Sequence, residues 1–179
     1  MKKLILFGDS LIANFHKADV STLENNTGYQ VYNCATCGWD TNDGVVKAPY
    51  IARLQPEVVV FSFGTNDSST WQQLEIATVA ENVKKIIEDF SGSVMIFLLP
   101  PPIDEDRQEL KKQRSNATIK QYAEAIKNVL IQNNIRYIDP AVFRQILDSG
   151  QDYHEEDGIH FNDLGYGTVI NEIVKILRT

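Results

Sequence analysis

The sequence is poor in cysteine, in histidine and in long hydrophobic runs. Two cysteines and three histidines occur among its 179 residues. No apolar run approaches the roughly 20 residues that a membrane-spanning helix needs. The apolar stretch after the two N-terminal lysines ends at Asp9, too early for the hydrophobic region of a secretory signal. We therefore expect a cytoplasmic protein without a membrane span.

The two cysteines, Cys34 and Cys37, have the spacing of a C-x-x-C pair, which occurs in redox motifs and in zinc sites. A tetrahedral zinc site needs two more ligands, and the sequence holds no second such pair. A redox pair is expected at a helix N-terminus, which lowers a thiol pKa. We expect both thiols to be small packing residues, and we expect no metal and no cofactor.

Basic residues are outnumbered, with 17 Lys and Arg against 24 Asp and Glu and a net charge of −7. Nucleic-acid binding needs clustered Lys and Arg, so we expect no nucleic-acid partner. Net charge otherwise bears on solubility rather than on fold. Hydrophobic residues make up 43% of the chain and charged residues 23%, which is typical of a globular protein. The length predicts a single domain over residues 1–179.

Short, almost continuously apolar segments alternate with segments of helical periodicity. The predicted strands are residues 3–7, 29–34, 58–63, 93–99 and 135–138, and the predicted helices include 43–54, 79–90, 119–130 and 166–177. Continuous apolar strands are typical of parallel sheets that are covered on both faces. The alternation predicts an α/β fold, a three-layer α/β/α sandwich whose five-stranded parallel sheet has the flavodoxin-like order 2-1-3-4-5.

Glycines and polar residues follow the predicted strands where each strand ends. The segments after the first four strands are, in order, Gly8-Asp9-Ser10, Cys37-Gly38-Trp39-Asp40, Gly64-Thr65-Asn66-Asp67 and Pro100-Pro101-Pro102. The carboxyl ends of parallel strands meet at one edge of a sheet, and ligands bind there where the strand order reverses. We therefore expect Ser10, Gly38 and Asn66 to converge on one crevice.

Asp157 and His160 lie three residues apart in a loop before the last predicted helix. One turn at this spacing brings the carboxylate against the imidazole and leaves the other ring nitrogen to face Ser10. A serine hydroxyl becomes a good nucleophile when a base takes its proton, and histidine suits that task near neutral pH. A carboxylate fixes the histidine tautomer and stabilises the imidazolium. The pattern predicts a catalytic group of Ser10, Asp157 and His160.

A carbonyl that is attacked by serine develops negative charge, which needs preorganised hydrogen-bond donors. The available donors are the backbone N–H groups of Ser10 and Gly38 and the side-chain amide of Asn66. Glycine at position 38 would let a substrate approach the backbone closely. We therefore predict an oxyanion hole formed by Ser10, Gly38 and Asn66.

Each of these residue types also has an ordinary structural explanation. Serine is favoured at the N-cap of a helix, which is the alternative for Ser10. Asn66 suits a turn, and Asp157 with His160 could form a solvated loop pair that adds little stability.

Other polar residues near these motifs are given no catalytic role. Asp9 is expected to brace its loop through backbone N–H groups, and Asp67 is expected to be a turn residue. We expect His16 and His154 to lie at the surface. The proline-rich loop 99–107 is expected either to line a cleft or to be a plain surface loop.

The segment Gly8-Asp9-Ser10-Leu11 resembles the signature of the GDSL family, within the SGNH hydrolase superfamily. That superfamily is named after four residues in four sequence blocks. This sequence matches all four with Ser10, with Gly38 (preceded by Asn33), with Asn66 and with Asp157-Gly158-Ile159-His160. The resemblance extends from residue 4 to about residue 167. It implies the α/β/α fold and the serine esterase chemistry of the family.

The function that the resemblance implies is a serine esterase or acylhydrolase, of the GDSL lipase type, acting on a small-molecule ester through an acyl-enzyme intermediate. The short chain favours small or short acyl groups. One alternative is a metal-dependent phosphoesterase with Asp9, Asp67, Asp157 and His160 as ligands. A non-catalytic carbohydrate- or lipid-binding module is another. A phosphoacceptor signalling domain has the same sheet order but needs a lysine after the fifth strand, where the sequence has Asp139.

Overall fold

The computed structural model of the chain describes residues 2–107 and 113–179. In them, five strands form one sheet: β1 (Lys3–Gly8), β2 (Gln30–Asn33), β3 (Val58–Ser62), β4 (Val94–Leu98) and β5 (Arg136–Ile138). All neighbouring strands are parallel, and their order is β2-β1-β3-β4-β5. The predicted sheet is therefore confirmed, and each strand end lies within one residue of the predicted one.

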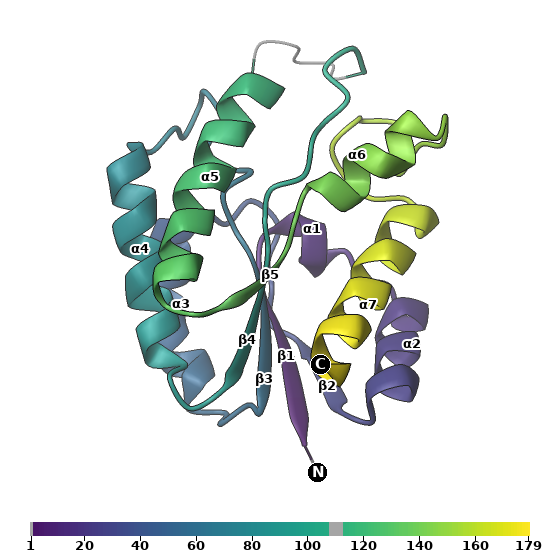
Figure 1. Ribbon diagram of the computed structural model, residues 1–179. Coiled ribbons are helices and arrows are strands. Elements are labelled where there is room, and N and C mark those ends of the chain that lie inside the picture. Colours follow the sequence, from purple (N-terminus) through teal and green to yellow (C-terminus); the bar gives the residue numbers. More distant parts are fainter. Residues whose placement is uncertain (1, 108–112) are drawn as a thin grey trace.

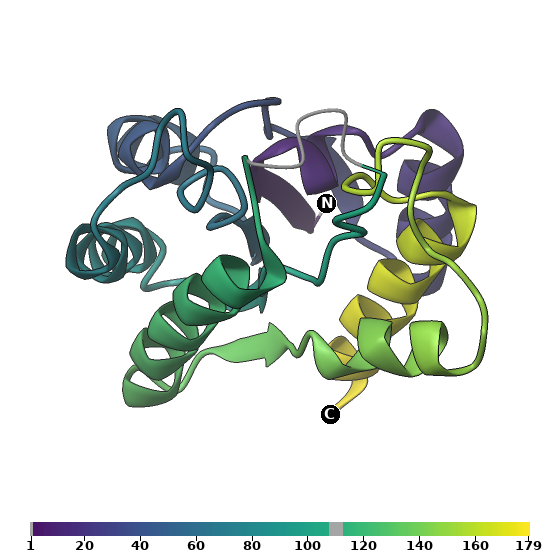
Figure 2. The same cartoon turned by 90° about the horizontal axis from the view of Figure 1, so that it is seen from above.

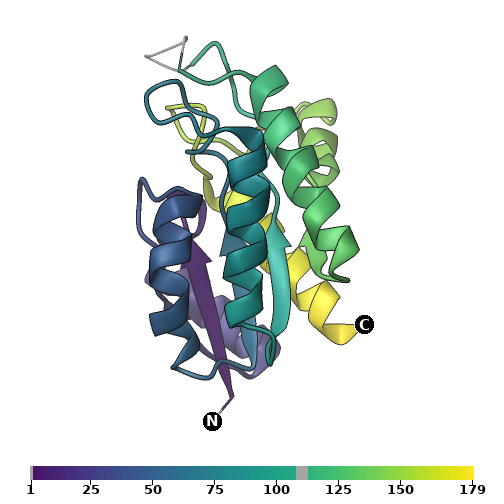
Figure 3. The same ribbon diagram turned by 90° about the vertical axis from the view of Figure 1, so that its left-hand side faces the viewer.

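Helices cover both faces of this sheet. They are α1 (Ser10–Ala13), α2 (Lys17–Thr27), α3 (Thr41–Ala52), α4 (Ile76–Asp89), α5 (Asn116–Gln132), α6 (Ala141–Asp148) and α7 (Asp163–Arg178). Figure 1 shows α3, α4 and α5 on one face and α1, α2, α6 and α7 on the other. Figure 3 shows the first of these layers in front of the sheet. The three-layer α/β/α sandwich is thus confirmed.

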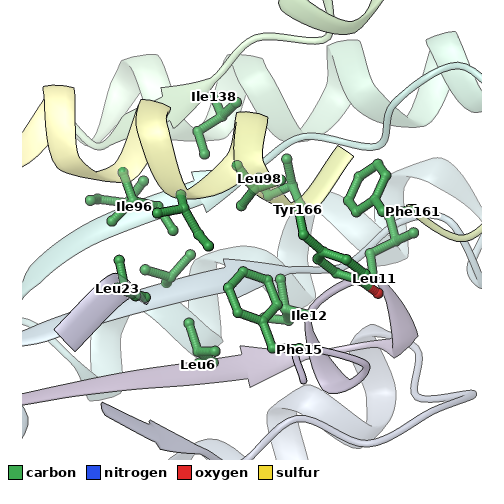
Figure 4. Close-up of a cluster of buried hydrophobic side chains, with 14 of the residues drawn as sticks. Leu6, Leu11, Ile12, Phe15, Leu23, Ile96, Leu98, Ile138, Phe161 and Tyr166 are labelled. Carbon is green, nitrogen blue, oxygen red and sulfur yellow. The ribbon is translucent and has the colours of Figure 1, made fainter. Parts of the chain in front are cut away.

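The hydrophobic core has two parts because successive side chains of a strand point to opposite faces of the sheet. On β1, Leu4 and Leu6 belong to the cluster beneath α7, whereas Ile5 and Phe7 belong to the cluster beneath α3, α4 and α5. Figure 4 shows the first cluster. Burying one such side chain stabilises the fold by about 1.5–3 kcal/mol, which explains why β1, β3 and β4 are almost continuously apolar.

The structure differs from the prediction in its helices. Helix α3 begins at Thr41, two residues before the predicted start, because the Asp40 carboxylate accepts hydrogen bonds from the N–H groups of Asn42 and Asp43. Helices α2 and α6 were not predicted. The only fully buried residue of α2 is Leu23, so its sequence lacks a clear apolar period. Helix α6 is amphipathic, with Val142, Phe143 and Ile146 facing the core, but it spans only eight residues.

The segments that carry the predicted site residues meet above the carboxyl ends of the strands. Figure 2 looks down on this edge and shows α1, the loop before α7 and the segment after β4 close together. The Asp104 N–H donates to the Gly158 carbonyl oxygen over 2.8 Å, which ties the last two of these segments. Within residues 2–107 and 113–179, no helix combines the length and the apolar character needed to cross a bilayer.

Candidate active site

Ser10 is the first residue of α1, directly after β1. A Cβ atom at Gly8 would lie 2.0 Å from the Ser62 carbonyl oxygen, so only glycine allows β1 and β3 to approach this closely. The N-cap of α1 is Asp9, whose carboxylate accepts the Leu11 N–H over 3.1 Å. The N-cap alternative for Ser10 is therefore wrong, and the prediction that Asp9 braces the loop is confirmed.

His160 lies between Ser10 and Asp157. Its Nε2 is 2.9 Å from the Ser10 Oγ, and its Nδ1 is 2.5 Å from the Asp157 Oδ2. Since a carboxylate only accepts hydrogen bonds, Nδ1 carries the proton, which leaves Nε2 free to accept the serine hydroxyl. The structure thus brings together three side chains that come from opposite ends of the chain.

The Asp157 carboxylate is held by more than the imidazole. Its Oδ1 accepts the backbone N–H groups of Ile159 and His160, over 2.8 and 2.9 Å. Partial burial raises the pKa of Asp157, but the hydrogen bonds from the side chain and backbone of His160 outweigh this effect and leave the pKa below its usual value. The carboxylate is therefore ionised at neutral pH and fixes the orientation of His160.

The three predicted oxyanion donors follow β1, β2 and β3, which are neighbouring strands of the parallel sheet. Within the described residues, neither the Ser10 N–H, in the first turn of α1, nor the Gly38 N–H has a hydrogen-bond partner. Gly38 has a φ of +84°, in the left-handed region that favours glycine. The Asn66 amide donates one hydrogen to the Trp39 carbonyl oxygen over 2.9 Å, beside Gly38, and within the described residues its second hydrogen has no acceptor.

The two buried carboxylates near this site bind the protein's own backbone. Asp67 accepts hydrogen bonds from the N–H and the hydroxyl of Thr41 and from the Gly64 N–H, and its role in the turn is confirmed. Burial raises the pKa of Asp67. The part of the chain that the structure describes contains no group of three or more His, Cys, Asp or Glu side chains arranged to hold a metal ion. The four ligands of the phosphoesterase alternative are therefore not gathered into one cluster.

Residues 6–167 match the GDSL-like lipase/acylhydrolase family, and this segment contains all four sequence blocks. The chain belongs to this family. A GDSL esterase/lipase of Arabidopsis thaliana is 32% identical over 145 residues, which cover 73% of this GDSL chain and 46% of the plant protein. The chain thus spans about half the length of that relative.

Solved structures agree with this assignment. A lipase/acylhydrolase from Enterococcus faecalis superposes with a TM-score of 0.88 and 26% identity, over 99% of this GDSL chain and 95% of that one. Est24, a carbohydrate acetylesterase from Sinorhizobium meliloti, superposes with a TM-score of 0.77 over 99% of both chains. At 15% identity, Est24 shows the shared fold alone. The comparisons favour an ester hydrolase over the phosphoesterase and the binding module.

The structure adds Arg114, which the sequence analysis did not single out, to the GDSL site. Arg114 lies just before α5, and its guanidinium donates to the Asn66 Oδ1 over 2.9 Å. It also contacts Thr65 and stacks on Trp71. No sequence signal marks this residue, because it is one of several cations in the segment KKQRSN and lies 48 positions from Asn66.

The prediction that His154 lies at the surface is wrong. Its side chain is almost fully buried, with Nδ1 2.8 Å from the Asp152 Oδ1 and Nε2 3.1 Å from the Pro102 carbonyl oxygen. Arg107 joins Asp152 to Asp104 by ion pairs. These contacts fasten the loop that carries His160 to the segment after β4. The prediction for His16 is confirmed, since 73% of its side chain is exposed.

The two cysteines are free and have different environments. Cys34 packs against the cluster beneath α3, α4 and α5, which confirms its packing role, and burial raises its pKa. Cys37 is exposed, with its Sγ 3.3 Å from the Asn14 Oδ1, so its predicted packing role is wrong.

The loop after β4 lines a cleft, which is one of the two roles predicted for it. A cavity of about 410 Å³ lies between this loop, α5 and the start of α6, and Pro100, Asn116 and Pro140 are among its lining residues. Ser10, Asp157 and His160 do not line it, so this cavity is separate from the candidate active site.

Asp9→Asn is expected to change how stability depends on pH. Burial raises the pKa of Asp9 from 3.8 to about 7, against hydrogen bonds from Ser62 and Leu11 that lower it. Between these values the unfolded chain ionises while the folded protein stays protonated, so rising pH lowers the free energy of unfolding. The loss is at most about 4 kcal/mol, is absent below about pH 4 and is complete above about pH 7. Urea denaturation across this pH range, for the wild type and for Asp9→Asn, measures it.

The variant keeps an oxygen that can accept from Leu11 and Ser62, but it cannot ionise. The stability difference between wild type and Asp9→Asn should therefore shift steadily in favour of the variant as pH rises. Asp89→Asn makes the same change at an exposed position and is the control. Parallel curves for the wild type and Asp9→Asn would contradict a buried, titrating Asp9.

Proposed function

We propose that this GDSL-family protein is a serine esterase or acylhydrolase that cleaves carboxylic esters of small or short-chain acids through an acyl-enzyme intermediate. The observation that carries the proposal is the continuous hydrogen-bonded path from the Ser10 Oγ through His160 to Asp157, with separations of 2.9 and 2.5 Å. The nucleophile, base and orienting acid of an acyl-transfer site are within reach of one another before substrate binds.

In the first step, the Ser10 Oγ attacks the ester carbonyl carbon while His160 Nε2 takes the hydroxyl proton. The electron pair of the C=O bond moves to the carbonyl oxygen, which becomes an oxyanion. The N–H groups of Ser10 and Gly38 and the amide of Asn66 donate to this oxygen. Removing one such donor typically lowers kcat by about 10²- to 10³-fold. Asp157 stabilises the imidazolium that forms on His160.

The second step releases the alcohol. The oxyanion collapses, the bond to the alcohol oxygen breaks, and His160 gives its proton to that oxygen.

Water then attacks the acyl-enzyme carbonyl while His160 takes one of its protons. The acid leaves as His160 returns the proton to the Ser10 Oγ. These steps use only groups of this chain and water, so we propose no cofactor and no metal.

The connections that follow β1 and β2 are short, which supports a small acyl group. Only Asp9 separates β1 from α1, and seven residues separate β2 from α3 (residues 34–40). Neither connection is long enough to form a lid over an extended acyl chain. We also propose a single domain over residues 1–179, because all five strands of the described residues belong to one sheet. The cytoplasmic location stays a prediction.

Two measurements test the proposed function. With p-nitrophenyl esters from acetate to dodecanoate, kcat/KM should be highest for the shortest acyl groups, and an acetylated sugar assayed in parallel tests a carbohydrate alcohol. A fluorophosphonate probe should label the protein stoichiometrically, and peptide mass analysis should place the label on Ser10. Activity that disappears with a chelator, or a label on another residue, would support the phosphoesterase or another nucleophile instead.

A further inference from the structure

Arg114 holds the residue that supplies the side-chain donor of the oxyanion hole. Its Nη2 donates to the Asn66 Oδ1 over 2.9 Å, and its Nε donates to the Thr65 carbonyl oxygen over 3.2 Å. The guanidinium carbon lies 4.4 Å from the centre of the Trp71 ring. The planar group is thus held along one edge and on one face, so its position relative to Asn66 is fixed.

Contacts at both ends fix the direction in which the Asn66 carboxamide faces. An arginine side chain has only donors, so only Oδ1 can face it. The Trp39 carbonyl oxygen has only lone pairs, so Nδ2 faces it, over 2.9 Å. Neither contact uses the second hydrogen of Nδ2. With Arg114 removed, Oδ1 loses its charged partner, and the carboxamide is held at its nitrogen end alone.

The charge of Arg114 acts directly on this carboxamide. In the described residues, the hydrogen-bond partners of the guanidinium are carbonyl oxygens rather than carboxylates. Half-burial lowers the pKa of Arg114 and the charges of Asp9 and Asp157 raise it, but arginine stays protonated throughout the neutral range. A hydrogen bond from a cation polarises the accepting amide, so its N–H groups become stronger donors, most of all where water is partly excluded.

We propose that Arg114 is a positioning residue of the ester hydrolysis: it orients and polarises the Asn66 carboxamide so that Nδ2 stabilises the oxyanion. This inference rests on the proposed function. Full negative charge develops on the carbonyl oxygen in the transition state and not in the bound substrate, so the effect belongs to kcat rather than to KM.

The structural alternative is that Arg114 only fastens two loops together. The neighbouring Gln113 does this, because its carbonyl oxygen accepts the Thr70 N–H over 2.9 Å. If Arg114 only fastened the loops, replacing it would change the stability of the protein, and its effect on kcat would not depend on Asn66. A positioning role needs the carboxamide, so a double-mutant cycle between Arg114 and Asn66 separates the two.

The experiment measures p-nitrophenyl acetate hydrolysis by Arg114→Gln, by Asn66→Ala and by the double variant. Arg114→Gln alone should lower kcat by about 10- to 100-fold with little change in KM. In the Asn66→Ala background, the same substitution should leave kcat unchanged, because no carboxamide is left to polarise. Arg114→Lys keeps the charge but loses the two-pronged contact, and its kcat should lie between those of the wild type and Arg114→Gln.

Arg53→Gln is the matched control, since Arg53 also lies over an aromatic ring, 5.6 Å from the centre of Tyr50, away from the site. Thermal unfolding checks each variant, and the cycle uses Arg114→Lys if Arg114→Gln does not fold. Equal losses of kcat in both backgrounds, a loss confined to KM, or no loss at all would overturn the positioning role. Near wild-type turnover by Ser10→Ala would instead refute the proposed function, so the two failures are distinguishable.

Discussion

Ser10→Ala is expected to lower kcat for p-nitrophenyl acetate by about 10⁵- to 10⁶-fold. The substitution removes the Oγ that lies 2.9 Å from the His160 Nε2 and would form the acyl-enzyme. The oxyanion donors stay in place, so slow attack by water leaves a small residual rate. Steady-state hydrolysis of the ester, together with loss of fluorophosphonate labelling, measures the effect.

The fold of Ser10→Ala should be intact. Alanine is a better helix former than serine at the start of α1, and Asp9 still caps the Leu11 N–H. Ser91→Ala, at an exposed position after α4, is the control for the chemical change and should keep full activity. A folded Ser10→Ala protein with near wild-type turnover would show that the nucleophile is another group.

The fold could be predicted because its main determinant is local in the sequence. Strands β1 and β3 are buried on both faces, so nearly all their residues are apolar, and glycine and polar residues follow them. The amphipathic helices α4, α5 and α7 bury several residues on one face, which gives a clear period. With strands and helices alternating, few topologies remain. Helix α2 lacks this signal, since it buries one side chain fully, and α6 is amphipathic but only eight residues long.

The predicted site residues lie at one edge of the sheet because of the strand order. The residues next to them in the sequence do not by themselves identify them. Ser10 and Asn66 follow β1 and β3, which lie side by side in the sheet. The Asp157–His160 contact needs only one turn of chain. The family signature then selects Gly38 among the residues after β2. Strand order and short spacings can both be predicted from one sequence.

Arg114 and His154 could not be predicted in this way. Both lie in irregular segments, where no period constrains the side chain. Key partners of both are backbone carbonyl oxygens, those of Thr65 and Pro102, and any residue type supplies such an acceptor. Their roles depend on how three loops pack against one another, which the sequence pattern does not determine. Contacts between loops, such as those of Arg114 and His154, are therefore seen only in the folded structure.

His160→Ala is expected to lower kcat about as much as Ser10→Ala, by about 10⁵- to 10⁶-fold, because the hydroxyl proton then has no acceptor. Nucleophile and base act as a unit, so their losses should not add. The double variant should therefore be no slower than either single variant. His16→Asn is the matched control: it removes an exposed imidazole and keeps a favourable N-cap residue for α2.

The non-additivity is a stricter test of the geometry than either loss alone. The 2.9 Å contact between the His160 Nε2 and the Ser10 Oγ implies that, in the first step, the imidazole acts on the ester through the serine hydroxyl. If His160 instead activated water directly, as a base in a one-step hydrolysis, then His160→Ala would slow the Ser10→Ala protein further. Equal residual rates in all three variants support the acyl-enzyme route, whereas a further drop in the double variant would contradict it.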